Sequence, residues 1–133
     1  MARNVQRPIS PHLQVYRFQY TMATSILHRF TGAALTGGAL LLTCWLASLS
    51  IGGFAYDIVQ WFINTIIGRL ALFGFTVSLY YHLANGIRHL IWDLGHGFAL
   101  KSAELGAYLV FGMTALLTVI TWIVGLLHLY EKL

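Results

Sequence analysis

Three long apolar stretches, separated by short polar segments, dominate the sequence. They run from about residue 24 to 50, from about 59 to 92 and from about 105 to 129. Each exceeds the roughly 20 apolar residues with which a helix crosses a bilayer, and the second is long enough to tilt or protrude. The pattern predicts an all-α membrane protein with a bundle of three transmembrane helices over residues 23–133, preceded by a surface arm at residues 1–22.

Prolines and glycines indicate where regular helix is interrupted. Pro8 and Pro11 disfavour a helix in the arm, because proline lacks a backbone N–H and restricts the residue before it. The run Ile51-Gly52-Gly53 ends the first span. A second loop, before the third span, is expected to contain Gly95, Gly97, Lys101 and Glu104.

Composition agrees with this class and leaves no room for a separate soluble domain. The 133 residues are 58% hydrophobic and only 9% charged, whereas soluble domains carry about 25% charged residues. The net charge of +4 is not gathered into a dense patch, so no nucleic-acid partner is expected. A single cysteine, Cys44, excludes an internal disulfide and a multi-cysteine iron–sulfur site within this chain.

The basic residues are unevenly distributed between the two sides of the predicted bundle. The first loop, around Asp57, has no Lys or Arg before Arg69, and the C-terminus has only Lys132. The positive-inside rule therefore predicts that the N-terminus and the second loop face the cytoplasm. The basic residues on that side are Arg3, Arg7, Arg17, Arg29, Arg88 and Lys101.

A histidine lies near the end of the second span. An ionisable residue there is costly and is a functional-site hypothesis, and neutral imidazole can ligate a metal or haem iron. His82 shares a helix face with Gly74, Ser78 and Gly86, which leave room for a flat ring or for a neighbouring helix. A hydrogen-bonded helix contact is an equal alternative. The residues that follow, at the depth of haem propionates or lipid headgroups, include Arg88, His89 and Asp93.

The first span begins with a second polar group. Ser25 and Arg29 share one helix face, and His28 and Gly32 share a neighbouring one. A hydroxyl beside a guanidinium suits a ligand with carbonyl oxygens or an anionic group. Alternatively, the arginine reaches lipid phosphate and the serine caps the helix. Antiparallel spans would bring seven candidates into one layer: Ser25, His28, Arg29, His82, Arg88, His89 and Asp93.

These two stretches, Ser25–Gly32 (SILHRFTG) and His82–Asp93 (HLANGIRHLIWD), resemble the signatures of the cytochrome b556 subunits of succinate dehydrogenase. Such subunits are the larger membrane anchors of respiratory complex II. The arm at Arg7–Tyr16 (RPISPHLQVY) is also similar to that family. With the three spans, the resemblance covers nearly the whole chain.

The resemblance implies a haem b held between this chain and a second membrane anchor subunit. His82 would be one axial ligand, and the second anchor would supply the other histidine. His28 would lie near the haem propionates, with Arg88 and His89 as further candidates from their position. Ser25 and Arg29 would line the ubiquinone site, where Asp93 is a candidate proton relay.

The implied partners are an iron–sulfur subunit, a flavoprotein that oxidises succinate at FAD, the second anchor and the lipid bilayer. Electrons would pass from the iron–sulfur subunit to ubiquinone, linking the tricarboxylic acid cycle to the respiratory chain. We expect a bacterial inner (cytoplasmic) membrane rather than a mitochondrial one. Two alternatives stay open: a fumarate reductase-type anchor, and a structural or assembly subunit without cofactor.

Overall fold

The computed structural model describes Val15 and residues 17–131, so most of the predicted surface arm lies outside the described residues. The described chain is helical, with α1 (Tyr20–Ile51), α2 (Gly53–Asn64), α3 (Ile66–Asp93) and α4 (Leu100–Tyr130). Three of these helices, α1, α3 and α4, are long and apolar enough to cross a membrane. The predicted all-α membrane fold with three spans is therefore confirmed.

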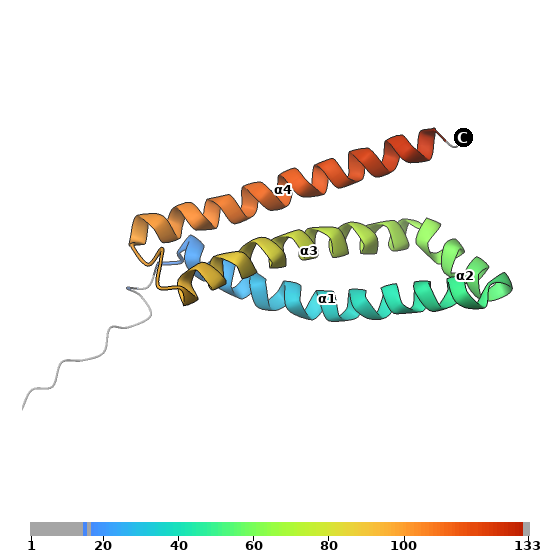
Figure 1. Cartoon of the computed structure of the whole chain (residues 1–133), viewed down its shortest axis with the longest axis horizontal. Helices are drawn as coiled ribbons and strands as arrows, with labels where there is room; N and C mark the ends of the chain where they lie inside the picture. Colours follow the sequence, from blue (N-terminus) through green and yellow to red (C-terminus); the bar gives the residue numbers. More distant parts are fainter. Residues whose placement is uncertain (1–14, 16, 132–133) are drawn as a thin grey trace, which may run out of the picture.

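Helix α3 is the centre of the arrangement, because it packs against both α1 and α4 (Figure 1). The short α2 joins α1 to α3 at one end of the bundle. At the other end, α1 and α4 begin close together, and the rings of Tyr20 and Tyr108 are 5.2 Å apart. We call this the histidine end, since His28 and His82 lie toward it, and the opposite end the α2 end.

The predicted second span, from about residue 59 to 92, is divided in the structure. Helix α2 ends at Asn64 and α3 begins at Ile66, because the Thr65 side chain caps α3 by accepting a hydrogen bond from the Gly68 backbone N–H at 3.0 Å. A Cβ atom at Gly68 would overlap the Phe62 carbonyl oxygen, so glycine lets the two helices meet. The unbroken apolar run concealed this cap.

Two other boundaries also differ from those predicted. Helix α4 begins at Leu100, so Lys101 and Glu104 lie in its first turns and not in the loop. Helix α1 begins at Tyr20, within the segment predicted as arm. Hydropathy locates the membrane crossing, whereas backbone hydrogen bonding continues into the polar flanks. The α3–α4 loop does contain the predicted glycines: Gly95 and Gly97 have φ of 82° and 81°.

The buried interior is small and unusually polar. Most large apolar side chains are exposed on the isolated chain, as expected for surfaces that meet lipid or another subunit. The fully buried side chains instead include Thr24 and Asn85, at 0% and 1% exposure, and Arg88 is only 7% exposed. These three polar residues lie at the histidine end, beside the candidate site.

Candidate functional site

Three histidines from two helices come together at the histidine end. His28 of α1 stacks on His82 of α3, with ring centroids 3.9 Å apart and planes 12° apart. The ring of His89, two turns further along α3, is 5.1 Å from that of His28. The antiparallel packing predicted from the sequence thus produces a histidine cluster, which we define as His28, His82 and His89.

His82 is held on its α1 side by two consecutive residues. Its Nδ1 lies 3.3 Å from the Thr31 hydroxyl oxygen. A Cβ atom at Gly32 would lie 3.2 Å from Cε1 of the ring, so glycine permits the close approach. By contrast, Cβ atoms at Gly74 and Gly86 would meet nothing within 4 Å among the described residues. Gly74 and Gly86 therefore face open space, whereas Ser78 of the same helix row is buried.

Arg88 is the hub of a buried polar network that joins three helices. Its guanidinium donates to Thr24 Oγ1 and to the Ala103 carbonyl oxygen, both at 2.8 Å, and lies 4.2 Å from the Trp92 ring centroid. Asn85 Oδ1 accepts a longer bond of 3.4 Å from the same group. These contacts hold α1, α3 and α4 together and include no histidine. Arg88, predicted near the propionates, is thus engaged within its own chain.

A second set of hydrogen bonds reinforces the start of α1. The Tyr81 hydroxyl donates to the Thr24 carbonyl oxygen at 3.0 Å, and the Asn85 side-chain amide approaches the same oxygen at 3.4 Å. Thr24 therefore receives bonds at both its side chain and its backbone from α3. Because the exposed Ser25 follows Thr24 directly, the network also fixes the position of Ser25 on α1.

Ser25 and Arg29 lie outside the histidine cluster, on the exposed surface of α1. Arg29 lines a shallow hollow of about 390 Å³ together with Ile26, Phe30 and Ala33. Asp93, the last residue of α3, is also exposed. The predicted layer therefore divides into an inner histidine cluster and an outer polar face that another subunit or a ligand can reach.

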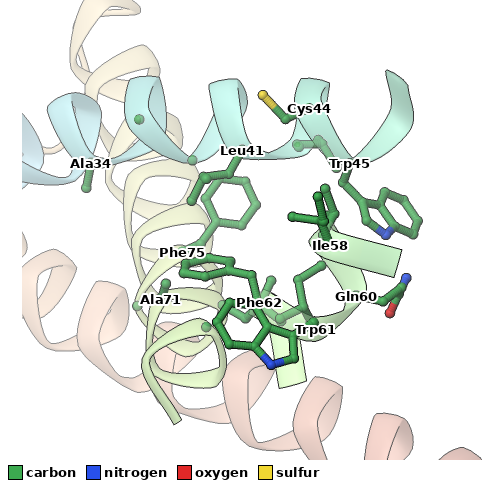
Figure 2. Close-up of a pocket in the computed structure, with 18 of the residues that line it drawn as sticks. Ala34, Leu41, Cys44, Trp45, Ile58, Gln60, Trp61, Phe62, Ala71 and Phe75 are labelled. Atoms are coloured by element: carbon green, nitrogen blue, oxygen red, sulfur yellow. The ribbon is translucent and has the colours of Figure 1, made fainter. Parts of the chain in front are cut away.

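A larger cavity lies at the α2 end and is not part of this site (Figure 2). It has a volume of about 980 Å³ and walls from α1, α2 and α3. Its lining is mostly apolar and includes Leu41, Trp45, Ile58, Phe62 and Phe75. A lining of this kind favours hydrocarbon or another apolar side chain over water.

The histidine cluster fits a planar metal cofactor bound through a single histidine of this chain. His28 Nδ1 is buried and has no hydrogen-bond partner among the described residues, and an unsatisfied buried polar atom of this kind is a mark of functional sites. Within residues 15 and 17–131, no three His, Cys, Asp or Glu side chains are grouped to hold a bare metal ion. Imidazole is also a common ligand of haem iron.

Four residues that bond across this end were not predicted from the sequence, namely Thr24, Thr31, Tyr81 and Asn85. Each lies in or beside one of the two quoted stretches. Spacing rules relate residues within one helix, however, and these contacts join α1 to α3. The polar identity of Thr24 and Asn85 in membrane-length helices was the signal that could have found them, since polar groups inside a membrane must find partners.

Together, these features define a multi-pass helical membrane protein with a histidine cluster between two antiparallel spans. The profile of the family described as "Succinate dehydrogenase/Fumarate reductase transmembrane subunit" matches residues 3–121. The chain therefore belongs to this family of transmembrane subunits, as its resemblance predicted.

Curated relatives extend the match over nearly the full length. The succinate dehydrogenase cytochrome b556 subunits of Rickettsia felis and Paracoccus denitrificans are each 38% identical over 118 residues, covering 89% of this chain and 92% and 91% of their own. A mitochondrial cytochrome b560 subunit from Sus scrofa is 38% identical over 117 residues, covering 85% of this chain and 68% of its own. This chain is thus similar to membrane cytochrome b subunits of an oxidoreductase complex.

Proposed function

We propose that this chain binds haem b and quinone as the membrane anchor of a succinate dehydrogenase, and conducts electrons from the iron–sulfur subunit to ubiquinone. The observation that carries the proposal is the His28–His82 stack between two spans, with a buried imidazole nitrogen left free of partners in the described chain. The relatives' names support succinate dehydrogenase over a fumarate reductase-type anchor.

In this proposal His82 is the axial ligand that the chain gives to the haem, and a second anchor subunit gives the other histidine. His28 and His89 would hydrogen-bond the propionates, because the His28 ring stacks on that of His82 and the His89 ring adjoins that of His28. Arg88 remains a candidate near the propionates and also bonds the helix junction. When bound, the haem supplies one-electron redox chemistry.

The quinone site is proposed on the outer face of α1. The Ser25 hydroxyl would donate a hydrogen bond to a quinone carbonyl oxygen, and Arg29 would stabilise negative charge that develops on the reduced oxygen. Reduction to the quinol also consumes protons, which Asp93 and nearby water would relay. Exposure of all three side chains leaves them accessible to ligand and to the iron–sulfur subunit.

The complete complex would contain the second anchor, the iron–sulfur subunit and a flavoprotein with FAD, in a bacterial cytoplasmic membrane. The uneven Lys and Arg distribution supports a cytoplasmic N-terminus. Cysteines introduced at Ala2 and Leu133, after Cys44→Ser, should then react with an impermeant thiol reagent from opposite sides of the membrane. Reaction from the same side would contradict an odd number of spans.

The central experiment replaces His82 with alanine in the purified complex and records the reduced-minus-oxidised absorbance spectrum. We expect the b-type bands of the native complex to be lost or greatly weakened. The matched control is His128→Ala, because His128 is exposed near the other end of α4. Native bands in an assembled His82→Ala complex would refute the ligand assignment. Absence of b-type bands from the native complex would favour a subunit without cofactor.

A further inference from the structure

The Thr31 hydroxyl contacts the backbone of its own helix and also a histidine ring on α3. Its hydroxyl oxygen lies 2.9 Å from the Leu27 carbonyl oxygen and 3.0 Å from the His28 carbonyl oxygen, both in the preceding turn of α1. The same oxygen lies 3.3 Å from Nδ1 of His82 on α3. One hydroxyl therefore connects the backbone of α1 to the ring of the proposed haem ligand.

The number of protons decides the direction of these bonds. A threonine hydroxyl has one proton to donate and two lone pairs to accept with. Carbonyl oxygens can only accept, and the two near Thr31 are closer to its hydroxyl than the ring nitrogen is. The hydroxyl proton is therefore directed to the carbonyls, and the contact with His82 is one in which Nδ1–H donates.

A neutral imidazole carries a single N–H, so a proton on Nδ1 leaves Nε2 with a free lone pair. We propose that Thr31 is a positioning residue that accepts a hydrogen bond from Nδ1–H of His82 and so presents Nε2 for axial ligation. This inference rests on the proposed haem-binding function.

Two neighbours assist Thr31 by limiting the movement of the ring. His28 stacks on one face of His82. Gly32 allows Cε1 to approach α1 so closely that a Cβ atom there would be crowded. With Nδ1 held by Thr31, the ring has little freedom to turn its other nitrogen away. The α1 segment His28–Gly32 thus sets both the tautomer and the orientation of a side chain on α3.

An acceptor on the N–H of a metal-bound histidine raises the basicity of the ligand, and its loss commonly weakens metal binding by about 10–100-fold. A more basic ligand stabilises ferric over ferrous iron. Removing the Thr31 hydroxyl should therefore raise the midpoint potential of the haem and reduce the haem retained per flavin. Loss of a merely structural backbone bond would not move the midpoint potential.

The test uses the purified complete complex with Thr31→Val, which keeps the side-chain shape and removes the hydroxyl. Thr31→Ser retains the hydroxyl and is the rescuing variant. Thr36→Val is the matched control, because the Thr36 hydroxyl donates to the Gly32 carbonyl oxygen at 3.2 Å and has no histidine contact given by the structure. Each complex is titrated for its haem midpoint potential and assayed for haem per flavin.

We expect a higher midpoint potential and less haem in Thr31→Val, with Thr31→Ser and Thr36→Val both close to native. A native midpoint in Thr31→Val, or an equal shift in Thr36→Val, would overturn the proposal. If the valine complex does not assemble, Thr31→Ala removes the same hydroxyl with less bulk and is judged by the same criteria. Failure of the haem assignment itself is separate, since native b-type bands would then persist in His82→Ala.

Discussion

The two ends of the bundle are built on different principles. At the histidine end, directional hydrogen bonds from Arg88 and Tyr81 converge on Thr24, and stacked rings fill the space between α1 and α3. At the α2 end the same two helices, with α2, enclose an apolar cavity of about 980 Å³. Figure 2 shows aromatic and aliphatic side chains around it, including Phe75 and Trp61.

This difference has a physical cause and a consequence. A buried polar group in a membrane has no water to replace a lost partner, so a hydrogen-bonded junction has few alternative arrangements. Apolar side chains beside a cavity can change rotamer at smaller cost. The histidine end is therefore suited to hold reacting groups at fixed positions, whereas the α2 end can adapt to what it packs against.

The largest effect is expected from Arg88→Leu. The change removes two charge-assisted bonds, one buried, to Thr24 Oγ1, and one partly buried, to the Ala103 carbonyl oxygen. Such bonds contribute about 1.5–3 kcal/mol each in soluble proteins, and bonds inside membranes measure weaker, so we expect a loss of about 3 kcal/mol. The readout is the thermal midpoint of the purified complex together with its haem content.

Arg69→Leu is the matched control at the α2 end. Arg69 is an exposed arginine of α3, in the helix turn that follows Thr65. Its replacement should leave the thermal midpoint and the haem content close to native. Equal destabilisation by the two substitutions would show that the Arg88 hydrogen bonds contribute no more to stability than an exposed arginine does. The proposed difference between the two ends would then be wrong.

The next effect concerns the outer face of α1. Ser25→Ala removes a neutral hydrogen bond of roughly 0.5–1.5 kcal/mol, so quinone reduction should fall by up to about tenfold. Arg29→Leu removes a charge-assisted partner and should reduce quinone reduction further. Succinate oxidation with an artificial acceptor that takes electrons upstream should be unchanged in both.

Leu41→Ala is the control for these variants, because Leu41 is on α1 but lines the cavity at the α2 end. It should spare both activities. The haem spectrum is recorded in every sample, since a disturbed haem would offer a second reason for slow quinone reduction. Equal retention of the two activities in intact Arg29→Leu complex would remove Arg29 from the quinone site.

The elements of the fold could be predicted because each depends on a local signal. Apolar length gave the three spans, and the glycine pair at Gly52 and Gly53 marked the first helix end. The α2–α3 break was missed because its cap, Thr65, is embedded in an apolar run, and hydropathy averages over such a position. Recognising it needed the backbone geometry of the turn, in which Gly68 closely approaches the Phe62 carbonyl oxygen.

The sequence predicted which candidate residues lie at the same depth of the bundle, but not which of them touch. Topology alone placed His28, His82 and His89 at one depth, and the structure gathers their rings. The same reasoning placed Arg88 in this layer as a candidate beside the propionates, and that role stays a prediction. Its bonds to Thr24 and to the Ala103 carbonyl oxygen were not foreseen, because they depend on the rotation of α3. Helix rotation depends on packing against neighbours, which periodicity did not resolve in a span apolar on every side.

The smallest and sharpest test compares two glycines of α1, each of which faces an aromatic ring of α3. At Gly32 a Cβ atom would lie 3.2 Å from Cε1 of His82, and at Gly38 it would overlap the Phe75 ring. The steric conflict is larger at Gly38, but Phe75 borders the cavity and can move into it. His82 cannot move as freely, because Thr31 and His28 hold its ring.

We therefore expect opposite phenotypes from the two alanine variants. Gly38→Ala should lower stability by about 1 kcal/mol, the mild end of overpacking, and leave the haem midpoint potential native. Gly32→Ala should leave the thermal midpoint of the complex nearly unchanged but shift the haem midpoint potential, because a displaced His82 ring weakens its bond to Thr31. If Gly38→Ala shifted the haem potential as much as Gly32→Ala, a packing change at the α2 end would alter the histidine end. The two ends would then not be structurally independent.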